Sequence, residues 1–188
     1  MSKTLENLAK AFVGESQARN RYTFYAKTAL KEGYLQISDI FLKTADNESQ
    51  HAKELLKMIK KIQGDVLDIK IEAEVPNVFG TTAENLRSAI EGEHHENSEM
   101  YPQFGNIAQE EEFLDVADKL RAIGFAEKHH EEVFIKLLAD IENSKVFQKD
   151  EEVQWECRKC GYLHTGKEAP EKCRSCDHPQ SYFQVFCN

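Results

Sequence analysis

The chain has 188 residues, a hydrophobic content of 40% and a formal net charge of -9 at pH 7. This length suits one larger domain with its own core and one small domain, and the negative charge argues against a nucleic-acid partner because phosphate binding needs a positive surface. No N-terminal segment reads as a signal peptide and no stretch approaches the roughly 20 apolar residues of a membrane span, so we expect a soluble, cytoplasmic protein without a membrane partner.

The first 64 residues predict two long amphipathic helices. Apolar residues recur at steps of three or four over residues 4–32 and again over residues 37–62, and a glycine follows each segment. Polar residues interrupt both apolar stripes, with Glu15 in the first helix and Glu48 and His51 in the second. Isolated buried carboxylates are unfavourable unless a strong positive charge lies among them.

Residues 81–107 predict a third helix. Thr81 followed by Glu84 is a capping-box signature for its start, and Pro102 is expected to kink the helix or end its regular part. The expected buried stripe consists of Leu86, Ile90, Glu93, Glu96, Met100, Phe104 and Ile107. Two glutamates therefore occupy the middle of this stripe.

A fourth helix is expected over residues 113–141, with Glu127 and His130 in its apolar stripe. The link over residues 63–81 can reach about 60 Å when extended, against about 40 Å for a helix of this length. It can therefore cross the whole bundle and make the second and third helices parallel. We predict a mainly α fold, a ferritin-like four-helix bundle with a long crossover, occupying residues 1–145.

Residues 146–152 are expected to form a linker to a small β and metal-knuckle domain over residues 153–188. The four cysteines of two Cys-x-x-Cys pairs lie there, twelve residues apart: Cys157, Cys160, Cys173 and Cys176. Two such pairs predict a tetrahedral four-thiolate metal site, and a domain this small needs a metal to fold. Taken alone, the fragment slightly favours structural zinc over one-electron iron. Cys187 has no partner in this scheme and is expected to be a spare thiol.

The polar residues of the bundle form a repeated pattern. A glutamate followed 33 or 34 residues later by Glu-x-x-His occurs twice, which places a carboxylate and an imidazole one turn apart on each of two helices. The predicted central site contains Glu15, Glu48, His51, Glu93, Glu96, Glu127 and His130, a set that suits two iron or manganese ions bridged by glutamates. A third Glu-x-x-His, at Glu91 and His94, falls off the stripe and is expected to be solvated. The hydroxyls of Tyr22 and Tyr101 could reach the carboxylates of this site, although core packing explains these tyrosines almost as well.

Four segments of the bundle and one of the cysteine domain resemble the rubrerythrin family: GESQARNRY (14–22), ADNESQHAK (45–53), GEHHENSEMYP (92–102), FAEKHHE (125–131) and CRKCGY (157–162). The resemblance covers nearly the whole chain and includes the domain order. It implies that the seven residues of the central site are di-iron ligands, and that the four cysteines hold a rubredoxin-type iron, with zinc as a product of mis-metallation. Asp177 is a departure, because glycine usually follows the second knuckle in simple rubredoxins.

The resemblance also implies an activity: a non-haem di-iron peroxidase that reduces hydrogen peroxide to water in oxidative stress defence. Electrons would pass singly through the four-thiolate iron from an external rubredoxin or an NAD(P)H-linked reductase. In rubrerythrins one iron exchanges a histidine ligand for a glutamate between redox states, which here would be His51 for Glu96. The family further implies a homodimer or a higher homo-oligomer, in which one subunit's cysteine domain faces the other subunit's bundle.

Two other functions fit parts of the sequence. A ferroxidase or iron-storage protein of the ferritin type would use the same bundle, but the cysteine domain would then have no obvious purpose. A structural or interaction protein would combine a zinc ribbon with a scaffold bundle. Mass in solution separates the first alternative from a peroxidase, and colour with iron content separates the second.

Overall fold

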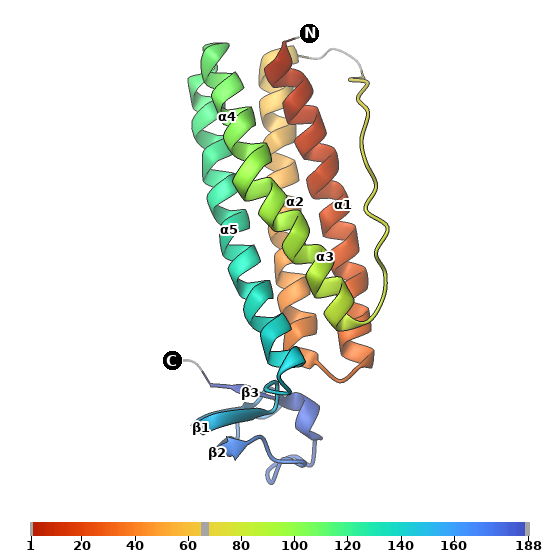
Figure 1. Cartoon of the computed structure of the whole chain (residues 1–188), viewed down its shortest axis with the longest axis vertical. Helices are drawn as coiled ribbons and strands as arrows, with labels where there is room; N and C mark the ends of the chain where they lie inside the picture. The colour runs from red at the N-terminus through yellow and green to blue at the C-terminus, as the bar shows by residue number, and fades with distance from the viewer. Residues whose placement is uncertain (1, 65–67, 187–188) are drawn as a thin grey trace.

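The computed structural model describes residues 2–64 and 68–186 and shows a long helical bundle with a small sheet at one end (Figure 1). The helical elements are α1 (Lys3–Lys31), α2 (Leu35–Gln63), α3 (Thr82–His95), the π-helical turn η1 (Glu96–Met100), α4 (Tyr101–Glu110) and α5 (Leu114–Glu142). Since α3, η1 and α4 follow one another without a break, they form the third long rod of the bundle. The predicted four-helix architecture is confirmed.

Local signals in the sequence fix the ends of these helices. Ser2 caps α1 by accepting a hydrogen bond from the backbone N–H of Leu5, and Thr81 and Glu84 form the predicted capping box of α3. Between α1 and α2 the chain reverses within three residues, where Gly33 has a φ of 86°, a conformation that glycine adopts without steric cost. This tight turn makes α1 and α2 antiparallel neighbours.

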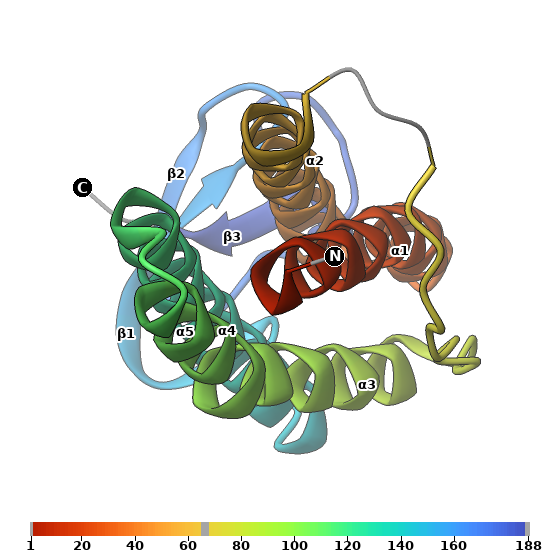
Figure 2. The same cartoon turned by 90° about the horizontal axis from the view of Figure 1, so that it is seen from above.

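The described part of the crossover, residues 68–80, has no regular secondary structure and runs along the outside of the bundle beside α1 to the start of α3 (Figures 1 and 2). The Tyr25 hydroxyl donates to the carbonyl oxygen of Val78 at 2.8 Å, and the rings of Phe24 and Phe79 are 6.4 Å apart. These contacts attach the crossover to α1. Because the crossover spans the bundle, α2 and α3 point in the same direction, as predicted for a ferritin-like bundle.

The predicted buried stripe of the third rod is correct only as far as Glu93. Beyond the π turn the buried residues are Tyr101, Gly105 and Ala108, each one position later than the expected Met100, Phe104 and Ile107. A π turn contains one residue more than an α turn, so every residue after it is displaced by one position along the stripe. The interruption ends two residues before Pro102, near the place where the sequence predicted irregularity.

Two apolar clusters fill the bundle, one on each side of its middle. The first contains Tyr22, Tyr25, Phe41 and Phe134 and lies toward the α1–α2 turn. The second contains residues of the opposite half, including Leu8, Leu55, Tyr101 and Leu120. Along α1 the residues between the two clusters are numbers 13–17, and this gap is where the polar site lies.

The small domain is a three-stranded antiparallel sheet in the order β2-β1-β3, made of β1 (Gln148–Cys157), β2 (Leu163–Glu168) and β3 (Phe183–Val185), with a short 3-10 turn η2 (Gln180–Tyr182). Trp155 is fully buried at the centre of its core. Residues 148–152 of the expected linker belong to β1. Cys187 lies outside the described residues.

The sheet contacts the end of the bundle at the α1–α2 turn (Figure 1). The Arg158 guanidinium donates to the Asp39 carboxylate of α2 and, at 2.6 Å, to the side-chain oxygen of Gln184. Arg158 lies directly after the first cysteine of the domain, so this contact links the cysteine site to α2. Within the described residues, none of the helices combines the length and the apolar character that crossing a membrane requires.

Candidate metal centres

Six of the seven predicted residues of the bundle site converge at its middle, from all four rods. Their potential ligand atoms form two groups in which all atoms lie within 4.8 Å of one another. One group consists of Glu15, Glu48, His51 and Glu127, and the other of Glu48, Glu93, Glu127 and His130. Glu48 and Glu127 belong to both groups. Each group is completed by one further glutamate and one histidine, which are Glu15 and His51 in the first group and Glu93 and His130 in the second.

The arrangement contains more acceptors than donors. Both oxygens of Glu127 lie 2.8 Å from an imidazole Nδ1, one from His51 and the other from His130, yet neither oxygen has a partner in hydrogen-bonding geometry. Buried oxygens of Glu15, Glu48 and Glu93 are also unpartnered. Buried polar groups are normally satisfied, so oxygens and nitrogens that converge without shared protons fit cations placed between them. Carboxylate with imidazole is the donor set of di-iron and di-manganese bundles.

The pKa values of these side chains also indicate that the site needs positive charge. Burial raises the pKa of Glu15 well above its usual range, and burial together with the nearby charges of Glu48 and Glu127 raises the pKa of Glu93 to about 8. Burial opposes a charged imidazole, but the carboxylates around His130 outweigh this effect and raise its pKa to about 12. Without a metal, the site holds protons in place of the positive charge that its carboxylates need.

Two buried tyrosines donate to the carboxylates across the bundle. The Tyr22 hydroxyl of α1 donates to Glu93 of α3 at 2.6 Å, and the Tyr101 hydroxyl of α4 donates to Glu15 of α1. Burial raises the pKa of both hydroxyls well above the usual range, which keeps them protonated as donors. The expected contact between these tyrosines and the carboxylates is therefore present, with each tyrosine bound to the glutamate of the opposite helix pair.

Glu96 is the predicted residue that the structure leaves outside both groups. It is the first residue of the π turn, and its side chain is partly buried. Burial and the charges of neighbouring glutamates, first of all Glu15, raise its pKa well above the usual range. The third Glu-x-x-His is solvated as predicted, because Glu91 is exposed and His94 pairs at the surface with Glu131 at 2.9 Å.

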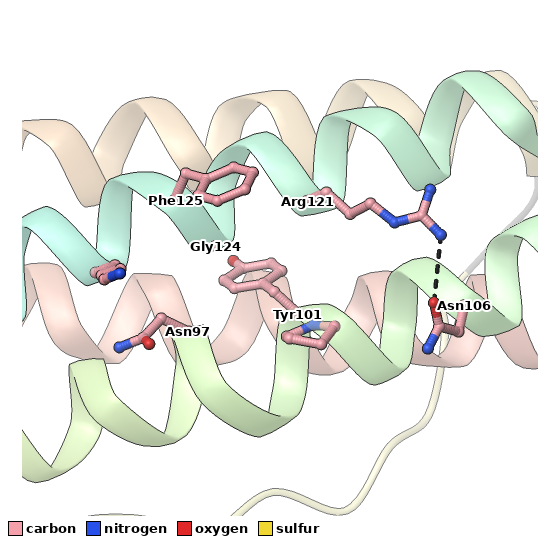
Figure 3. A pocket seen from close by; sticks show the side chains of 8 residues that line it. Asn97, Tyr101, Asn106, Arg121, Gly124 and Phe125 are labelled. Atoms are coloured by element: carbon pink, nitrogen blue, oxygen red, sulfur yellow. Dashed lines mark hydrogen bonds between the residues drawn. The ribbon is translucent and has the colours of Figure 1, made fainter.

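Sequence reasoning missed two residues next to the site. The Asn97 side chain donates to the carbonyl oxygen of Glu93 at 2.6 Å and to Glu131 at 2.7 Å, so it ties the π turn to α5. Gly124 lies against Tyr101 between α4 and α5 (Figure 3), where a Cβ atom would come within 3.0 Å of the Tyr101 Cβ. Periodicity marks buried faces but gives no sign of such a close approach between two helices.

The four predicted cysteines meet in the small domain, where their sulfur atoms form one group. The Sγ atoms of Cys157 and Cys176, and those of Cys160 and Cys173, are 3.7 Å apart. Metal–sulfur bonds of about 2.3 Å in a tetrahedron would separate the sulfurs by about 3.8 Å. The cysteine site therefore fits a four-thiolate metal ion, and these distances suit iron and zinc alike.

The surroundings of the cysteines act on their thiols in different directions: the backbone N–H of His178 favours the Cys176 thiolate, but burial and the neighbouring cysteines raise the pKa of Cys176 to about 12, and burial raises the pKa of Cys157. The backbone N–H of Tyr162 lowers the pKa of the Cys160 thiol to about 7. Gly161, after the first knuckle, has a φ of 74°, and Asp177, after the second knuckle, has a φ of 59°. Asp177 therefore adopts the left-handed conformation that glycine adopts without steric cost, and the Asp177 N–H donates to the Cys173 carbonyl oxygen at 3.0 Å.

Comparison with protein families gives two matches that together cover most of the chain. A family model described as Rubrerythrin matches residues 6–138, the part that contains both ligand groups of the bundle. A second model, described as the rubredoxin-like domain of rubrerythrin, matches residues 155–184, the part that contains the four cysteines.

Individual proteins agree over the full length. A putative rubrerythrin of Methanocaldococcus jannaschii is 58% identical over 192 residues, which cover 100% of this chain and 94% of the relative. The rubrerythrin of Clostridium perfringens is 51% identical over 98% of this chain and 95% of its own length. Among solved structures, a mixed-valence state of nigerythrin superposes with a TM-score of 0.67 at 32% identity, covering 99% of this chain and 88% of that one.

Proposed function

Because this chain belongs to the rubrerythrin family, we propose that it is an iron-dependent peroxidase that reduces hydrogen peroxide to water in oxidative stress defence. The observation that carries the proposal is the pair of ligand groups that share Glu48 and Glu127, since shared carboxylates suit two ions held side by side. The cysteine site in the same chain supports a redox role, because iron in four thiolates is a one-electron carrier.

In this proposal, Glu15 and His51 would hold one iron, Glu93 and His130 would hold the other, and Glu48 and Glu127, which belong to both groups, would be ligands of both. A relative supports iron as the metal, because one solved structure of nigerythrin is described as fully reduced and all ferrous. Two ferrous ions would supply the two electrons that, with two protons, convert one hydrogen peroxide into two water molecules. We propose the same metal for Cys157, Cys160, Cys173 and Cys176, with zinc bound there by mis-metallation.

The residues of the bundle provide positioning around this chemistry. Tyr22 and Tyr101 each hold one terminal glutamate by a hydrogen bond from across the bundle, which fixes the orientation of those carboxylates. The two apolar clusters close the site above and below, so bulk water does not reach it along the bundle axis. Carboxylates and water inside the site are the carriers we propose for the two protons.

Glu96 is the ligand that we propose to exchange with His51 when the redox state changes. Its place outside both groups supports a carboxylate that binds in one state only, and a carboxylate suits ferric iron better than imidazole does. Replacement of Glu96 by Ala is expected to lower peroxidase turnover in steady-state assays while the iron content stays the same. Unchanged turnover would show that the exchange is not required.

We further propose that electrons enter through the cysteine site from an external rubredoxin or an NAD(P)H-dependent reductase, and that the protein acts as a homodimer or a higher homo-oligomer. The cysteine domain lies at the α1–α2 end of the bundle, and the first apolar cluster lies between it and the ligand groups of the same chain. This separation favours transfer to the bundle of a second copy. The four cysteines among the described residues are free, which suits a reducing compartment, so we place the protein in the cytoplasm.

The test of the assignment is the Glu127→Ala variant, which removes a carboxylate from both ligand groups. It is expected to abolish the di-iron absorption and at least 90% of the peroxidase activity, on the order of the losses seen when a metal site is disrupted, and to leave the visible bands of the cysteine site unchanged. Glu91→Ala is the matched control, because it removes the glutamate of the solvated Glu-x-x-His and should alter neither signal. Loss of both signals in Glu127→Ala would instead indicate a role in folding.

A further inference from the structure

A cavity of about 360 Å³ lies on the side of the bundle where α1, the crossover and the third rod meet. Gly14 and Gln17 of α1 line one wall, Gly92 of α3 and Glu96 of η1 line the opposite wall, and Pro76 of the crossover lines it from the outside. The volume exceeds that of several water molecules. None of the grouped ligands lines this cavity, but Glu96 does, and Glu96 follows Glu93 by one helical turn, so the cavity lies beside the ligand groups.

The two glycines in this cavity have no packing reason to be glycine. A Cβ atom at Gly92 would meet nothing within 4 Å, and one at Gly14 would meet only the Glu96 Oε1 atom at 3.9 Å, an ordinary contact. Neither residue has the positive φ that requires glycine. By contrast, a Cβ at Gly105 or Gly124 would approach the facing helix to 3.2 or 3.0 Å, and close packing explains those two.

Glycine in the middle of a helix is unfavourable compared with alanine, so the two unexplained glycines call for a benefit other than stability. Both lie directly before a glutamate of the ligand groups, Gly14 before Glu15 and Gly92 before Glu93. Both face the same open space. A side chain at either position would occupy part of the cavity. Glycine at both positions therefore keeps the cavity open.

The lining also indicates what can pass through it. Cationic side chains (Lys10 and Arg21) and acidic ones (Glu72, Glu74, Glu96 and Glu99) both surround the cavity, so neither anions nor cations are favoured throughout. A small, uncharged, polar molecule suits this environment best. The other cavity near the site, about 250 Å³ between α4 and α5 (Figure 3), also has none of the grouped ligands in its lining, and it lacks Glu96; the buried Tyr101, which donates to Glu15, lines it instead.

We propose that the cavity between α1, α3 and the crossover is the route by which a small peroxide reaches the metal centre, and that Gly14 and Gly92 are specificity-determining residues that keep this route open. The inference rests on the proposed function for the identity of the substrate. Whether the route is open rests on the structure alone, so the two can be tested separately.

The first experiment measures access in the iron-loaded protein, without any assay of activity. The thiol introduced by Gly92→Cys is treated with methyl methanethiosulfonate, which is small, and with a bulky maleimide, and labelling is followed by mass spectrometry of the peptide. Ser98→Cys, at an exposed position of η1, is the matched control. We expect the Gly92→Cys thiol to react with the small reagent at a rate within tenfold of the control and with the maleimide at least tenfold more slowly than the control. No reaction with the small reagent, or equal access for both reagents, would overturn the route.

The second experiment blocks the route in the iron-loaded protein. Gly92→Phe, or Gly14→Phe from the opposite wall, is expected to lower kcat/KM for hydrogen peroxide at least tenfold with unchanged iron content. Ser98→Phe, which adds the same ring outside the cavity, should leave kcat/KM within twofold of the wild type. Gly92→Ala should raise the melting temperature, because the fold does not require glycine there.

The outcomes separate the route from the function. If the wild type consumes peroxide and both phenylalanine variants consume it equally fast, the route is wrong and the proposed function stands. If the wild type consumes no peroxide, the proposed function is wrong, and with it the substrate named for the route. A Gly92→Ala variant that melts at a lower temperature than the wild type would show that the glycine serves packing, and would overturn its role in specificity.

Discussion

At the level of single residues, the two tyrosines of the site show how the halves of the bundle are joined. Tyr22 and Glu15 lie on α1, and Tyr101 and Glu93 lie on the third rod, yet each tyrosine binds the glutamate of the other rod. Each hydrogen bond therefore fixes a carboxylate of one helix pair to the other pair. A buried carboxylate with a neutral donor also retains its charge more easily than one without any donor.

Replacing Tyr22 by Phe should separate positioning from packing. The ring stays in the first apolar cluster, but the Glu93 oxygen loses its donor, and we expect kcat/KM for peroxide to fall about 10- to 100-fold, as for other residues that orient metal ligands. The free energy of unfolding should fall by about 1–3 kcal/mol because a buried acceptor is left unpaired. Denaturant titration and steady-state kinetics measure the two effects.

The matched control is Tyr25→Phe, one helical turn further along α1. Its hydroxyl is bound to the Val78 carbonyl oxygen of the crossover at 2.8 Å, so this variant also removes one hydrogen bond from a buried tyrosine. It should lose stability by about 0.5–1.5 kcal/mol and retain its activity. Equal losses of activity in the two variants would show that Tyr22 acts through packing alone.

Periodicity was enough to predict which residues face the middle of the bundle, because a buried glutamate or histidine in an apolar stripe is conspicuous. It could not predict that Glu96 stays outside both groups while Glu93, one turn earlier, belongs to one of them. Both residues occupy the same face of the helix, and the distance of each to the other rods depends on how the rods pack. For the same reason, periodicity could not predict that Tyr22 binds Glu93 of the third rod and that Tyr101 binds Glu15 of α1.

At the level of the elements, the π turn η1 is the feature that most changes the third rod. Tyr101 follows Glu93 by eight residues, which in a regular α-helix would place it about 80° away around the axis. The π turn absorbs the extra residue, so Tyr101 faces the core with Glu93 and buries its ring completely. The turn begins at Glu96, and it therefore sets both the position of Glu96 and the register of α4.

Deleting Ser98 from the π turn should convert it into an α turn without disturbing the rest of the rod. Tyr101 would then follow Glu93 by seven residues, about 20° from the same face, and Gly105 and Ala108 would remain in the core. We expect a cooperative unfolding transition and an unchanged helical content in circular dichroism. Peroxidase activity should fall, because the backbone that carries Glu96 changes.

Deletion of Gln103, which is also exposed, is the control for this experiment. It lies in regular α-helix, so no irregular turn can absorb the missing residue, and Asn106 and Gln109 would enter the places of Gly105 and Ala108. Stability should fall by at least about 4 kcal/mol, as for other changes that bury unpartnered polar groups. Similar stability of the two deletions would show that η1 is not an inserted residue in an otherwise regular helix.

The other elements differ in how well the sequence predicts them. Pro102 signals an interruption, because it lacks an N–H donor, but it does not reveal that the chain gains one residue and continues. The segment 148–152 reads as a polar linker because its strand lies at the surface of a small sheet, where alternation of apolar and polar residues is weak. The capping box at Thr81 and the turn at Gly33 were predictable because each depends on neighbouring residues alone.

At the level of the whole molecule, the two metal centres stabilise their surroundings very differently. The bundle has an apolar cluster on each side of its ligand groups, so its helices remain packed when the metal is absent. The small domain has a core of five buried residues, two of which are the cysteines Cys157 and Cys173. A domain of that size gains its folding free energy largely from the metal.

Removal of the metals should therefore unfold one domain and leave the other folded, and the chain contains a specific reporter for each. Trp155 is its only tryptophan; it is fully buried in the small domain, with its indole N–H bound to the Gly166 carbonyl oxygen at 3.0 Å. After treatment with a strong chelator under reducing conditions, we expect the tryptophan emission to shift to longer wavelength. The helical circular dichroism signal at 222 nm should fall by less than about one tenth, because a bundle of this length keeps most of its buried apolar surface. The Cys173→Ser variant should show the shifted emission before any chelator is added, and Glu127→Ala should show it only afterwards. If the helical signal is lost together with the tryptophan shift in the wild type, the packing of the two clusters does not suffice, and the bundle depends on its metal ions as strongly as the small domain does.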